Sequence, residues 1–425
     1  MLFAELESRG LAYQCTSDDL KKALETPMSF YCGFDPTSDS LHVGSLLPLM
    51  TMRRLQDRGH KPIMLLGGAT GMIGDPSGKS KERNLQSRDI INANALGIKK
   101  NAERVLDFSG PNGAQLVNNA DWMATYSYID FLRDIGKHFT VNYMTAKDSV
   151  KSRVENSEHG ISYTEFSYML LQAYDFYHLH KTQNCQLQIG ASDQWGNITA
   201  GVELIRRMQG ESHNKDVAFG LTFPLVTKPD GTKFGKTESG NVWLSPDKTS
   251  PYQFYQFFLR LPDDEVLKLL KYFSLKSLNE ISVLESAMQS APQERAAQNA
   301  LAEELTTLIH GQDELKRVKH ASQVLFSGEL QQLDEKTLKE VFSEAPSVQV
   351  AKTQKAEITL VDVLVQSQLC SSKGAARKDI KAGAIYLNNQ RFEGEDLPGN
   401  DLPLLFDSLL VLRRGKKSYC LVQFS

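Results

Sequence analysis

The chain is 425 residues long, with 41% hydrophobic residues and a formal net charge of −3. This length exceeds the roughly 100 to 200 residues of an ordinary domain, so we expect two or three domains. The charge excludes a protein that is basic over its whole surface, and no run approaches the roughly 18 apolar residues of a membrane span. The acidic, amphipathic start MLFAELESRG is unlike a signal peptide, which predicts a cytoplasmic protein without membrane association.

The cysteines are scattered along the chain. They form neither a CxxC pair nor a Cys/His cluster with zinc-ligand spacing, and they are Cys15, Cys32, Cys185, Cys370 and Cys420. We therefore expect free thiols and no structural metal.

Strand-like apolar runs alternate with amphipathic helices in the first half of the chain. Residues 29–34 (SFYCGF) predict a buried strand, and residues 41–58 predict a helix with an apolar face. Residues 62–66 (PIMLL) predict a second strand that runs into a glycine-rich turn, and residues 185–190 (CQLQIG) a later one. This order predicts an α/β fold with a Rossmann-like, doubly wound parallel sheet.

Helical patterns follow one another from about residue 250 to residue 325, as in DDEVLKLLKYF, and they predict a separate α-helical domain. Between about residues 328 and 357 the sequence is polar and has no long periodicity, so we expect a linker with at most a short helix. A small α+β module ends the sequence, with expected helices near 361–368 and 373–382 and expected strands near 384–388 and 409–424.

Basic residues are in excess at the carboxyl end. Residues 361–425 contain nine Lys or Arg and seven Asp or Glu, so this part has a net charge of +2 and the part before it −5. A cluster surrounds Gly415, and it consists of Arg413, Arg414, Lys416 and Lys417. From charge alone, this cluster is either a contact for phosphate or a solvated hairpin turn.

The segment YCGFDPTSDSLHVGS carries the first group of residues suited to chemistry. Asp35 and Pro36 end the strand, and residues 37–40 offer capping groups, so we expect His42 in the first turn of a helix. Free N–H groups and the helix dipole favour an anion there, and a histidine can donate a hydrogen bond to a phosphate oxygen. The alternative is a surface histidine near a helix start.

A glycine-rich turn, GGATGMIGDPSGKSKER, follows the second expected strand. A phosphate-binding P-loop needs four residues between its first glycine and its Gly-Lys pair, whereas only three separate Gly74 from Gly78. We reject the P-loop on this spacing. The turn then either directs Asp75 into the crevice where open α/β sheets bind ligands, or has only a structural role.

The segment TEFSYMLLQAYDF places Tyr168, Gln172 and Asp175 on one face of one helix, at positions i, i+4 and i+7. A buried carboxylate is costly without a partner, so this polar stripe faces either other protein groups or a polar ligand. Further along, KFGKT offers Lys233, Lys236 and Thr237. Lysines on a glycine-containing loop can neutralise a leaving pyrophosphate, although a charged surface loop explains the same letters.

These motifs in this order resemble those of class I aminoacyl-tRNA synthetases, and specifically of the bacterial tyrosyl-tRNA synthetase family. HVGS is similar to the HIGH signature of that class and KFGKT to its KMSKS loop. YCGFDPT, GGATGMIGDPSGK, TEFSYMLLQAYDF and QIGASDQWGN are close to hallmarks of the tyrosyl family. The resemblance covers nearly the whole chain. It implies a ligase that activates L-tyrosine with ATP and transfers it to tRNA(Tyr).

The resemblance also implies roles for residues at matching positions. Tyr31 and Asp175 would hydrogen-bond the phenolic hydroxyl of tyrosine. Its ammonium group would be held by Asp75, Tyr168 and Gln172. An ionised aspartate accepts from a hydroxyl, and several acceptors suit an ammonium with three donors.

For the nucleotide, the resemblance implies that Thr37 and His42 stabilise the α-phosphate and that Lys233, Lys236 and Thr237 act on the pyrophosphate. Other expected ATP contacts are Gly33, Asp35, Gly44, Ser45 and Asp193, while Gln194 would contact tyrosine. ATP, accompanied by Mg²⁺, is then a substrate, and no tightly bound cofactor is expected. Ser45 replaces the second histidine of the class signature, so its hydroxyl would reach less far toward a ribose.

The segment SSKGAARKDIKAGAIYLNN resembles a small RNA-binding domain found in a ribosomal protein and in RNA-modifying enzymes. RNA phosphates would meet Arg377, Lys378 and Lys381 on one helix, and the RRGKK turn. The family implies a homodimer with an interface near residues 129–144. The expected domains are a catalytic domain with this dimerisation segment (1–225), the KFGKT loop with a helical anticodon-arm domain (226–330), a linker (331–358) and the RNA-binding module (359–425).

Three other functions compete with this one. An ATP-dependent kinase or NTPase would need the P-loop spacing that the sequence lacks. A synthetase-like protein that only binds RNA would not need His42, Lys233 and Lys236. The related tryptophanyl enzyme makes no comparable use of Tyr31 and Asp175, because an indole has no hydroxyl.

Overall fold

A six-stranded sheet organises the first part of the chain. The computed structural model describes residues 1–77, 85–155, 160–210, 217–227, 231–232, 234–237, 240–415 and 418–425. The sheet has the order β1-β6-β5-β2-β3-β4, in which β1 is antiparallel and the other pairs are parallel. Its strands are β1 (Gln14–Cys15), β2 (Ser29–Phe34), β3 (Lys61–Leu66), β4 (Gln115–Asn118), β5 (Cys185–Ala191) and β6 (Phe219–Phe223).

The parallel sheet predicted from the sequence is confirmed. In β3, five consecutive residues from Pro62 to Leu66 are buried, as expected of a strand covered on both faces. Tyr31, Ile63 and Leu65 pack with Phe176 in one core cluster, so these alternate positions face the same layer of helices. The edge strands β1 and β4 and the inner strand β6 were not among the expected strands.

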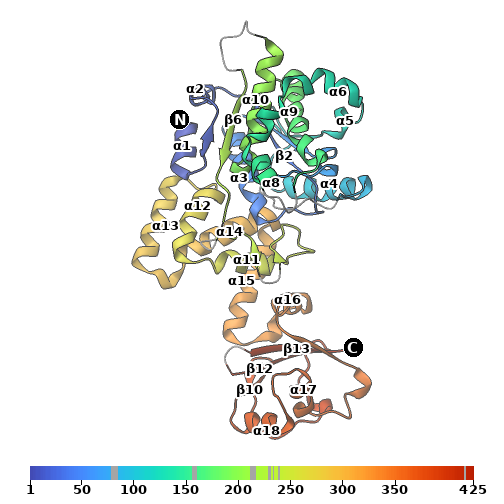
Figure 1. The fold of residues 1–425 in the computed structure, drawn as a ribbon. Helices are drawn as coiled ribbons and strands as arrows, with labels where there is room; N and C mark the ends of the chain where they lie inside the picture. Colours follow the sequence, from blue (N-terminus) through green and yellow to red (C-terminus); the bar gives the residue numbers. More distant parts are fainter. Residues whose placement is uncertain are drawn as a thin grey trace. The chain divides into compact units, whose positions relative to one another are not determined.

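Helices cover the sheet in the pattern of a doubly wound fold (Figure 1). α3 packs against β3 and β5, and the neighbouring helices α9 and α10 pack against β5. The helices of this part are α1 (Leu2–Arg9), α2 (Asp19–Ala23), α3 (Leu46–Asp57), α4 (Arg88–Ala102), α5 (Ala120–Met123), α6 (Tyr128–Asp134), α7 (Val141–Thr145), α8 (Asp148–Glu155), α9 (Tyr163–Gln183) and α10 (Trp195–Gln209). No helix among the described residues is both long and apolar enough to span a membrane.

The chain divides into two compact units. The first comprises Met1–Thr249 and Phe257–Ile309, and the second comprises Ser250–Gln256 and His310–Ser425. The expected run of helices is present as α11 (Pro251–Leu259), α12 (Asp263–Phe273), α13 (Leu278–Ser290), α14 (Ala296–His310) and α15 (Gln312–Ser327). These helices do not form a separate domain but are shared between the two units. The sequence could not show this, because helical periodicity reveals an apolar face but not the neighbour that covers it.

The second unit contains a five-stranded sheet with the order β11-β10-β12-β13-β9. Its elements are α16 (Glu335–Val341), β9 (Ser347–Val350), α17 (Leu360–Gln366), α18 (Lys373–Lys381), β10 (Ile385–Leu387), β11 (Gln390–Arg391), β12 (Leu409–Arg414) and β13 (Ser418–Phe424). Here the structure differs from the expected linker, because β9 pairs in parallel with β13. The alternation of SVQV fits a strand, but four residues are too few to predict one.

Candidate active site

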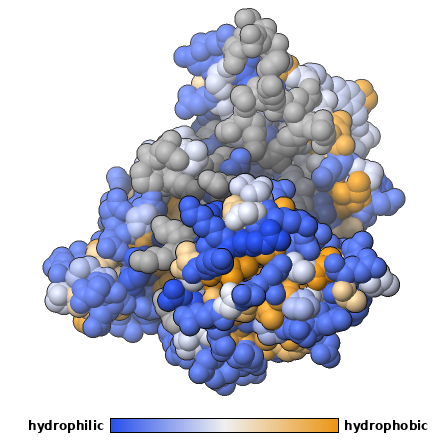
Figure 2. All heavy atoms as spheres, turned by 90° about the horizontal axis from the view of Figure 1, so that it is seen from below, coloured by the Kyte–Doolittle hydropathy of each residue, from blue (hydrophilic) through white to orange (hydrophobic). Residues whose placement is uncertain are grey.

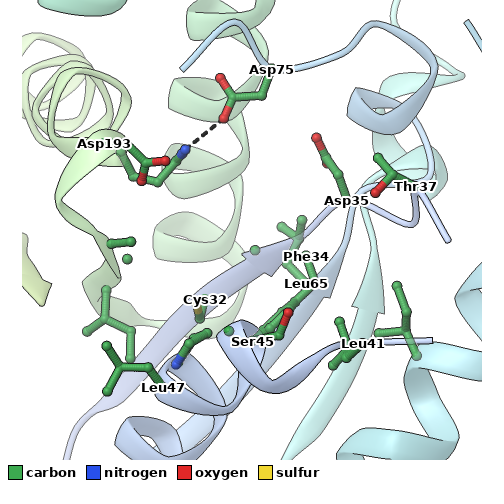
Figure 3. A pocket seen from close by; sticks show the side chains of 18 of the residues that line it. Cys32, Phe34, Asp35, Thr37, Leu41, Ser45, Leu47, Leu65, Asp75 and Asp193 are labelled. Atoms are coloured by element: carbon green, nitrogen blue, oxygen red, sulfur yellow. Dashed lines mark hydrogen bonds between the residues drawn. The ribbon is translucent and has the colours of Figure 1, made fainter. Parts of the chain in front are cut away.

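A cavity of about 520 Å³ opens at the carboxyl ends of β2 and β5. These two neighbouring strands mark the point where the strand order reverses, since β3 follows β2 on one side and β6 follows β5 on the other. Open α/β sheets bind ligands at this point. Figure 3 shows Asp75 and Asp193 near each other on one side of the pocket, with Asp35 and Thr37 on another side.

Most of the predicted site residues line this one cavity. They come from β2 and the loop after it, from the glycine-rich turn, from α9 and from the end of β5. The lining includes Tyr31, Gly33, Asp35, Thr37, His42, Gly44, Ser45, Asp75, Tyr168, Gln172, Asp175, Asp193 and Gln194. Residues as far apart in the sequence as Tyr31 and Gln194 are thus brought to one place.

Asp175 is a buried residue of the cavity lining, with 1% of its surface exposed. Its carboxylate accepts hydrogen bonds from Asn119 Nδ2 at 2.9 Å and Trp122 Nε1 at 2.8 Å. Burial raises the pKa of Asp175 to about 7, although the two hydrogen bonds act in the opposite direction. The carboxyl group therefore changes charge near neutral pH.

The Tyr31 hydroxyl is buried and has no hydrogen-bond partner among the described residues. Its ring packs against Phe176, with 5.3 Å between the ring centroids. Burial, and then the nearby Asp175 charge, raise the pKa of Tyr31, so the phenol keeps its proton and can donate it in a hydrogen bond. A buried hydroxyl without a partner costs free energy, about 1 to 3 kcal/mol, which a polar ligand can recover.

Asp75 belongs to a second polar group in the cavity wall. Its carboxylate accepts from Gln194 Nε2 at 2.7 Å (dashed in Figure 3) and from the Ser77 backbone N–H at 2.9 Å. Asn197 Nδ2 donates to Gln172 Oε1 at 3.1 Å and to Gln194 Oε1 at 3.3 Å. Asn197 thus orients both glutamines. Each amide oxygen keeps a second lone pair, so these oxygens and the Asp75 carboxylate can accept hydrogen bonds from a cation.

Tyr168 donates its hydroxyl hydrogen to Asp35 Oδ2 at 2.8 Å. This leaves the phenol oxygen as an acceptor, which suits the ammonium contact implied for Tyr168. The other oxygen of Asp35 accepts from Thr70 Oγ1 at 2.8 Å, and Thr70 in turn accepts from Asn119 Nδ2 at 2.9 Å. Because Asn119 also bonds Asp175, one chain of hydrogen bonds joins Asp175 to Asp35.

His42 does not lie in the first turn of a helix as expected. It precedes a short 3₁₀ helix, Val43–Ser45, and its extended backbone forms a β-bridge with Trp243. Its Nδ1 accepts from the Gly44 N–H at 3.0 Å, so the neutral ring carries its hydrogen on Nε2, from which it can donate. A Cβ at residue 44 would lie 2.8 Å from the imidazole, which explains the glycine at this position.

The KFGKT segment includes a small antiparallel hairpin, in which β7 (Lys236–Thr237) pairs with β8 (Gly240–Asn241). The Lys236 side chain is exposed and is not among the residues that line the cavity. Lys233 and the side chain of Thr237 lie outside the described residues, so the structure gives no position for them.

In the second unit, the predicted RNA-contacting side chains Arg377, Lys378 and Lys381 are exposed on α18. Arg414 on β12 forms an ion pair with Asp379 of the same helix at 2.8 Å. The Arg413 guanidinium lies 3.7 Å from the centroid of the Tyr386 ring. Lys416 and Lys417 lie outside the described residues.

Sequence reasoning missed the side chains that support the predicted ones. Asn119 and Trp122 follow β4, a strand that was not expected, so their place beside Asp175 could not be foreseen. Thr70 lies within the glycine-rich turn, and Asn197 within QIGASDQWGN, yet neither stood out among its neighbours. The signal available was the polar run NNADW directly after an apolar segment, LV.

Comparison with known proteins shows the family of the chain. The family described as tRNA synthetases class I (W and Y) matches residues 22–327, and a tyrosine–tRNA ligase SYY-like C-terminal domain matches residues 337–422. The chain is 51% identical to the tyrosine–tRNA ligase of Staphylococcus haemolyticus over 425 residues, covering 100% of this chain and 99% of that protein. It is 52% identical over 433 residues to tyrosine–tRNA ligase 1 of Bacillus subtilis, with coverage of 100% and 99%.

Among solved structures, a C-terminally truncated mitochondrial tyrosyl-tRNA synthetase of Aspergillus nidulans is similar to this chain. Its TM-score is 0.69 at 34% sequence identity, and the match covers 76% of this chain and 94% of that one. Sequence, domain content and fold therefore agree, and the chain belongs to the tyrosyl-tRNA synthetases of class I, which are tyrosine–tRNA ligases.

Proposed function

We propose that the cavity binds tyrosine and ATP side by side and joins them as tyrosyl-adenylate with release of pyrophosphate. Tyrosine then passes to the terminal adenosine of tRNA(Tyr). The observation that carries this proposal is that one cavity is lined both by the buried Tyr31 hydroxyl, which has no hydrogen-bond partner in the described part of the chain, and by the buried Asp175 carboxyl. A phenol that enters here supplies both with a partner.

In this proposal the tyrosine hydroxyl donates to Asp175 and accepts from the Tyr31 hydroxyl. The ammonium group donates to Asp75, Tyr168 and Gln172, with Gln194 beside them. Asn197 supports this arrangement because it already orients both glutamine side chains. A site that binds the hydroxyl with buried polar groups discriminates strongly against phenylalanine, because phenylalanine leaves those groups unpaired. Tyrosyl-tRNA synthetase is itself the standard example of this effect.

For ATP, we assign contacts with the nucleotide to Gly33, Asp35, Gly44, Ser45 and Asp193. Thr37 and His42 donate hydrogen bonds to the α-phosphate as the tyrosine carboxylate attacks it. Lys233, Lys236 and Thr237 act on the leaving pyrophosphate. Mg²⁺ enters with the triphosphate as part of the substrate, which is the usual way proteins bind this ion.

Catalysis under this assignment needs no covalent bond to the protein. The pocket holds the carboxylate in line with the α-phosphorus, and hydrogen-bond donors stabilise the charge that develops on the phosphate oxygens. The His42 tautomer supports this role, since the bond from Gly44 to Nδ1 leaves the ring hydrogen on Nε2.

We further propose that the module beyond residue 358 binds the tRNA. Arg377, Lys378 and Lys381 offer three exposed cations on one helix, which suits contact with phosphates. The sequence adds four further cations to this module, Arg413, Arg414, Lys416 and Lys417, which we also assign to RNA binding. On the coloured part of the surface in Figure 2, hydrophilic residues surround smaller groups of hydrophobic ones. The helices of residues 226–330 would contact the anticodon arm.

A homodimer completes the proposal, with its interface near residues 129–144. Large hydrophobic side chains are exposed there and nearby, namely Tyr128, Ile129, Val141 and Tyr163. Contiguous exposed apolar groups are typical of surfaces that another chain covers. We expect the dimer to act in the cytoplasm, with the substrates of translation.

The test is exchange of pyrophosphate into ATP with each of the twenty amino acids in turn. Tyrosine alone should support rapid exchange. Equal exchange with phenylalanine would reject the assignment of Tyr31 and Asp175 as the residues that read the hydroxyl, and exchange with tryptophan would reject the pocket as a tyrosine site.

A further inference from the structure

One short segment joins the two motifs that we assign to phosphate chemistry. The backbone N–H of Val242 donates to the Gly235 carbonyl of the KFGKT segment at 2.8 Å. The Val242 carbonyl accepts from the N–H of Val43, in the HVGS segment, at 2.9 Å. Leu244 then donates to the Leu41 carbonyl at 2.8 Å. Residues 241–244 therefore form a strand-like connection between HVGS and KFGKT.

Trp243 is the residue of this connection that reaches the cavity. It forms the β-bridge with His42, and it lines the same cavity as His42. Its ring meets the imidazole edge to face, with 6.1 Å between centroids and 69° between the planes. Aromatic pairs prefer this geometry, so the contact favours one orientation of the His42 ring.

Groups on the neighbouring loop hold the indole in turn. The Lys248 ammonium lies 4.9 Å from the centroid of the Trp243 ring, and it also pairs with Asp39 at 2.5 Å. The Trp243 backbone N–H donates to Thr249 Oγ1 at 2.9 Å. The indole thus contacts both the Lys248 ammonium and the His42 imidazole. Asp39 itself belongs to the loop that leads into HVGS.

We propose that Trp243 is a positioning residue for adenylate formation, which holds the His42 imidazole in the orientation that donates to the α-phosphate. This rests on the proposed role of His42. Gly44 fixes one nitrogen of the ring, and Trp243 limits its rotation from the side. Val242, the neighbour of Trp243, is hydrogen-bonded to both motifs. A shift of the KFGKT hairpin would therefore also shift Trp243, and with it the His42 ring.

A double-mutant cycle tests this proposal directly. The single-turnover rate of tyrosyl-adenylate formation is measured in wild type, Trp243→Ala, His42→Ala and the double variant. Trp243→Ala should slow the wild-type enzyme at least about fivefold, yet slow the His42→Ala enzyme less than about twofold. The tyrosine dissociation constant should stay within about twofold of wild type, because packing around Asp175 and Asp75 is untouched.

Two further variants guard against a folding defect in Trp243→Ala. Trp243→Phe keeps an aromatic edge against His42, so it should recover at least about half of the wild-type rate. Lys248→Met removes the cation from the indole, and the rate should fall about twofold. Lys21→Met is its matched control, since Lys21 also pairs with an aspartate, Asp18, and lies 5.3 Å from the Phe3 ring centroid. Its rate should equal that of wild type.

The outcomes separate this proposal from the one on which it rests. If Trp243→Ala slows both backgrounds by the same factor, Trp243 does not act through His42 and the inference fails alone. An unchanged rate in His42→Ala would overturn the role of His42, and with it this inference. Wild-type rates in both Trp243→Phe and Trp243→Ala would also overturn it.

Discussion

At the scale of single residues, the charge of Asp175 is set by opposing effects. Burial favours the protonated form, whereas the hydrogen bonds from Asn119 and Trp122 favour the ionised form. Burial prevails in the free protein, and the pKa rises to about 7. A tyrosine hydroxyl is a third donor that favours the ionised form, so tyrosine binding should be coupled to loss of a proton.

The first prediction concerns the pH dependence of tyrosine binding. Only the ionised carboxylate accepts the phenolic hydrogen, and the ionised fraction falls as pH drops below 7. The tyrosine dissociation constant should therefore rise about tenfold between pH 8 and pH 6. Equilibrium dialysis at constant ionic strength measures it. Binding of phenylalanine, which lacks the hydroxyl, is the control and should change much less; equal slopes for both ligands would contradict the assignment.

Tyr31→Phe should separate stability from activity. Its hydroxyl has no hydrogen-bond partner among the residues that the structure describes, so removing it should leave the free energy of unfolding unchanged or raise it by up to about 3 kcal/mol. The same change should lower kcat/KM for tyrosine activation, which corresponds to a loss of about 0.5 to 1.5 kcal/mol of transition-state stabilisation. For phenylalanine, kcat/KM should change less. Urea unfolding and pyrophosphate exchange measure the two effects. A loss of stability would mean that the hydroxyl already has a partner.

The sequence predicted the polar residues that line the cavity better than the side chains that form hydrogen bonds with them. The spacing of Tyr168, Gln172 and Asp175 on one helix follows from helical geometry alone, and all three line the cavity. Asn119 and Thr70 meet Asp175 and Asp35 only because separate strands end at one edge of the sheet. Spacing within one element cannot reveal a contact between elements.

At the scale of elements, the hairpin of β7 and β8 presents Lys236 outside the cavity lining. Lys236→Ala should slow tyrosyl-adenylate formation at least about tenfold and leave the tyrosine dissociation constant nearly unchanged, because the ammonium acts on the departing pyrophosphate. Single-turnover kinetics measure the rate, with the exposed Lys22→Ala as a control. Wild-type kinetics in Lys236→Ala would remove this residue from the mechanism.

β3 was predictable from the sequence because its five consecutive apolar residues, Pro62 to Leu66, are the pattern of a strand buried on both faces. β2 has a similar run, with three consecutive buried residues from Phe30 to Cys32. β4 and β9 have four residues each, of which none is buried in β4 and one, Val350, is buried in β9. So short a run has no clear period. These segments are strands because they pair with strands that lie far away in the sequence, β4 with β3 and β9 with β13.

At the scale of the whole molecule, removing the second sheet should separate the two half-reactions. A chain ended at Gly328, before α16 and β9, should form tyrosyl-adenylate at nearly the parental rate. Charging of tRNA should fall at least about tenfold, because the phosphate contacts of the module are lost. Ending the chain at Glu357 instead would leave β9 without β13, its partner strand. Parental charging by the shorter chain would assign the module another task.

A triple variant keeps the module folded and tests its charge alone. Replacing Arg377, Lys378 and Lys381 by Ala should weaken tRNA binding and reduce the slope of log affinity against log salt by up to about three. Adenylate formation serves as the internal control and should not change. An unaltered salt slope would place the RNA contacts elsewhere on the chain.

The parallel pairing of β9 with β13 has a consequence for how the second unit folds. Ser347 pairs with Leu421, and Val350 with Phe424, so each contact closes a loop of more than 70 residues. β12 and β13 are close in the sequence, since β12 ends at Arg414 and β13 begins at Ser418, so this hairpin can form early. Contacts between distant segments require the loop between them to be ordered before the contact stabilises the fold, and this loss of chain entropy slows folding. The addition of β9 should therefore be the late kinetic step, after the β12–β13 hairpin is in place.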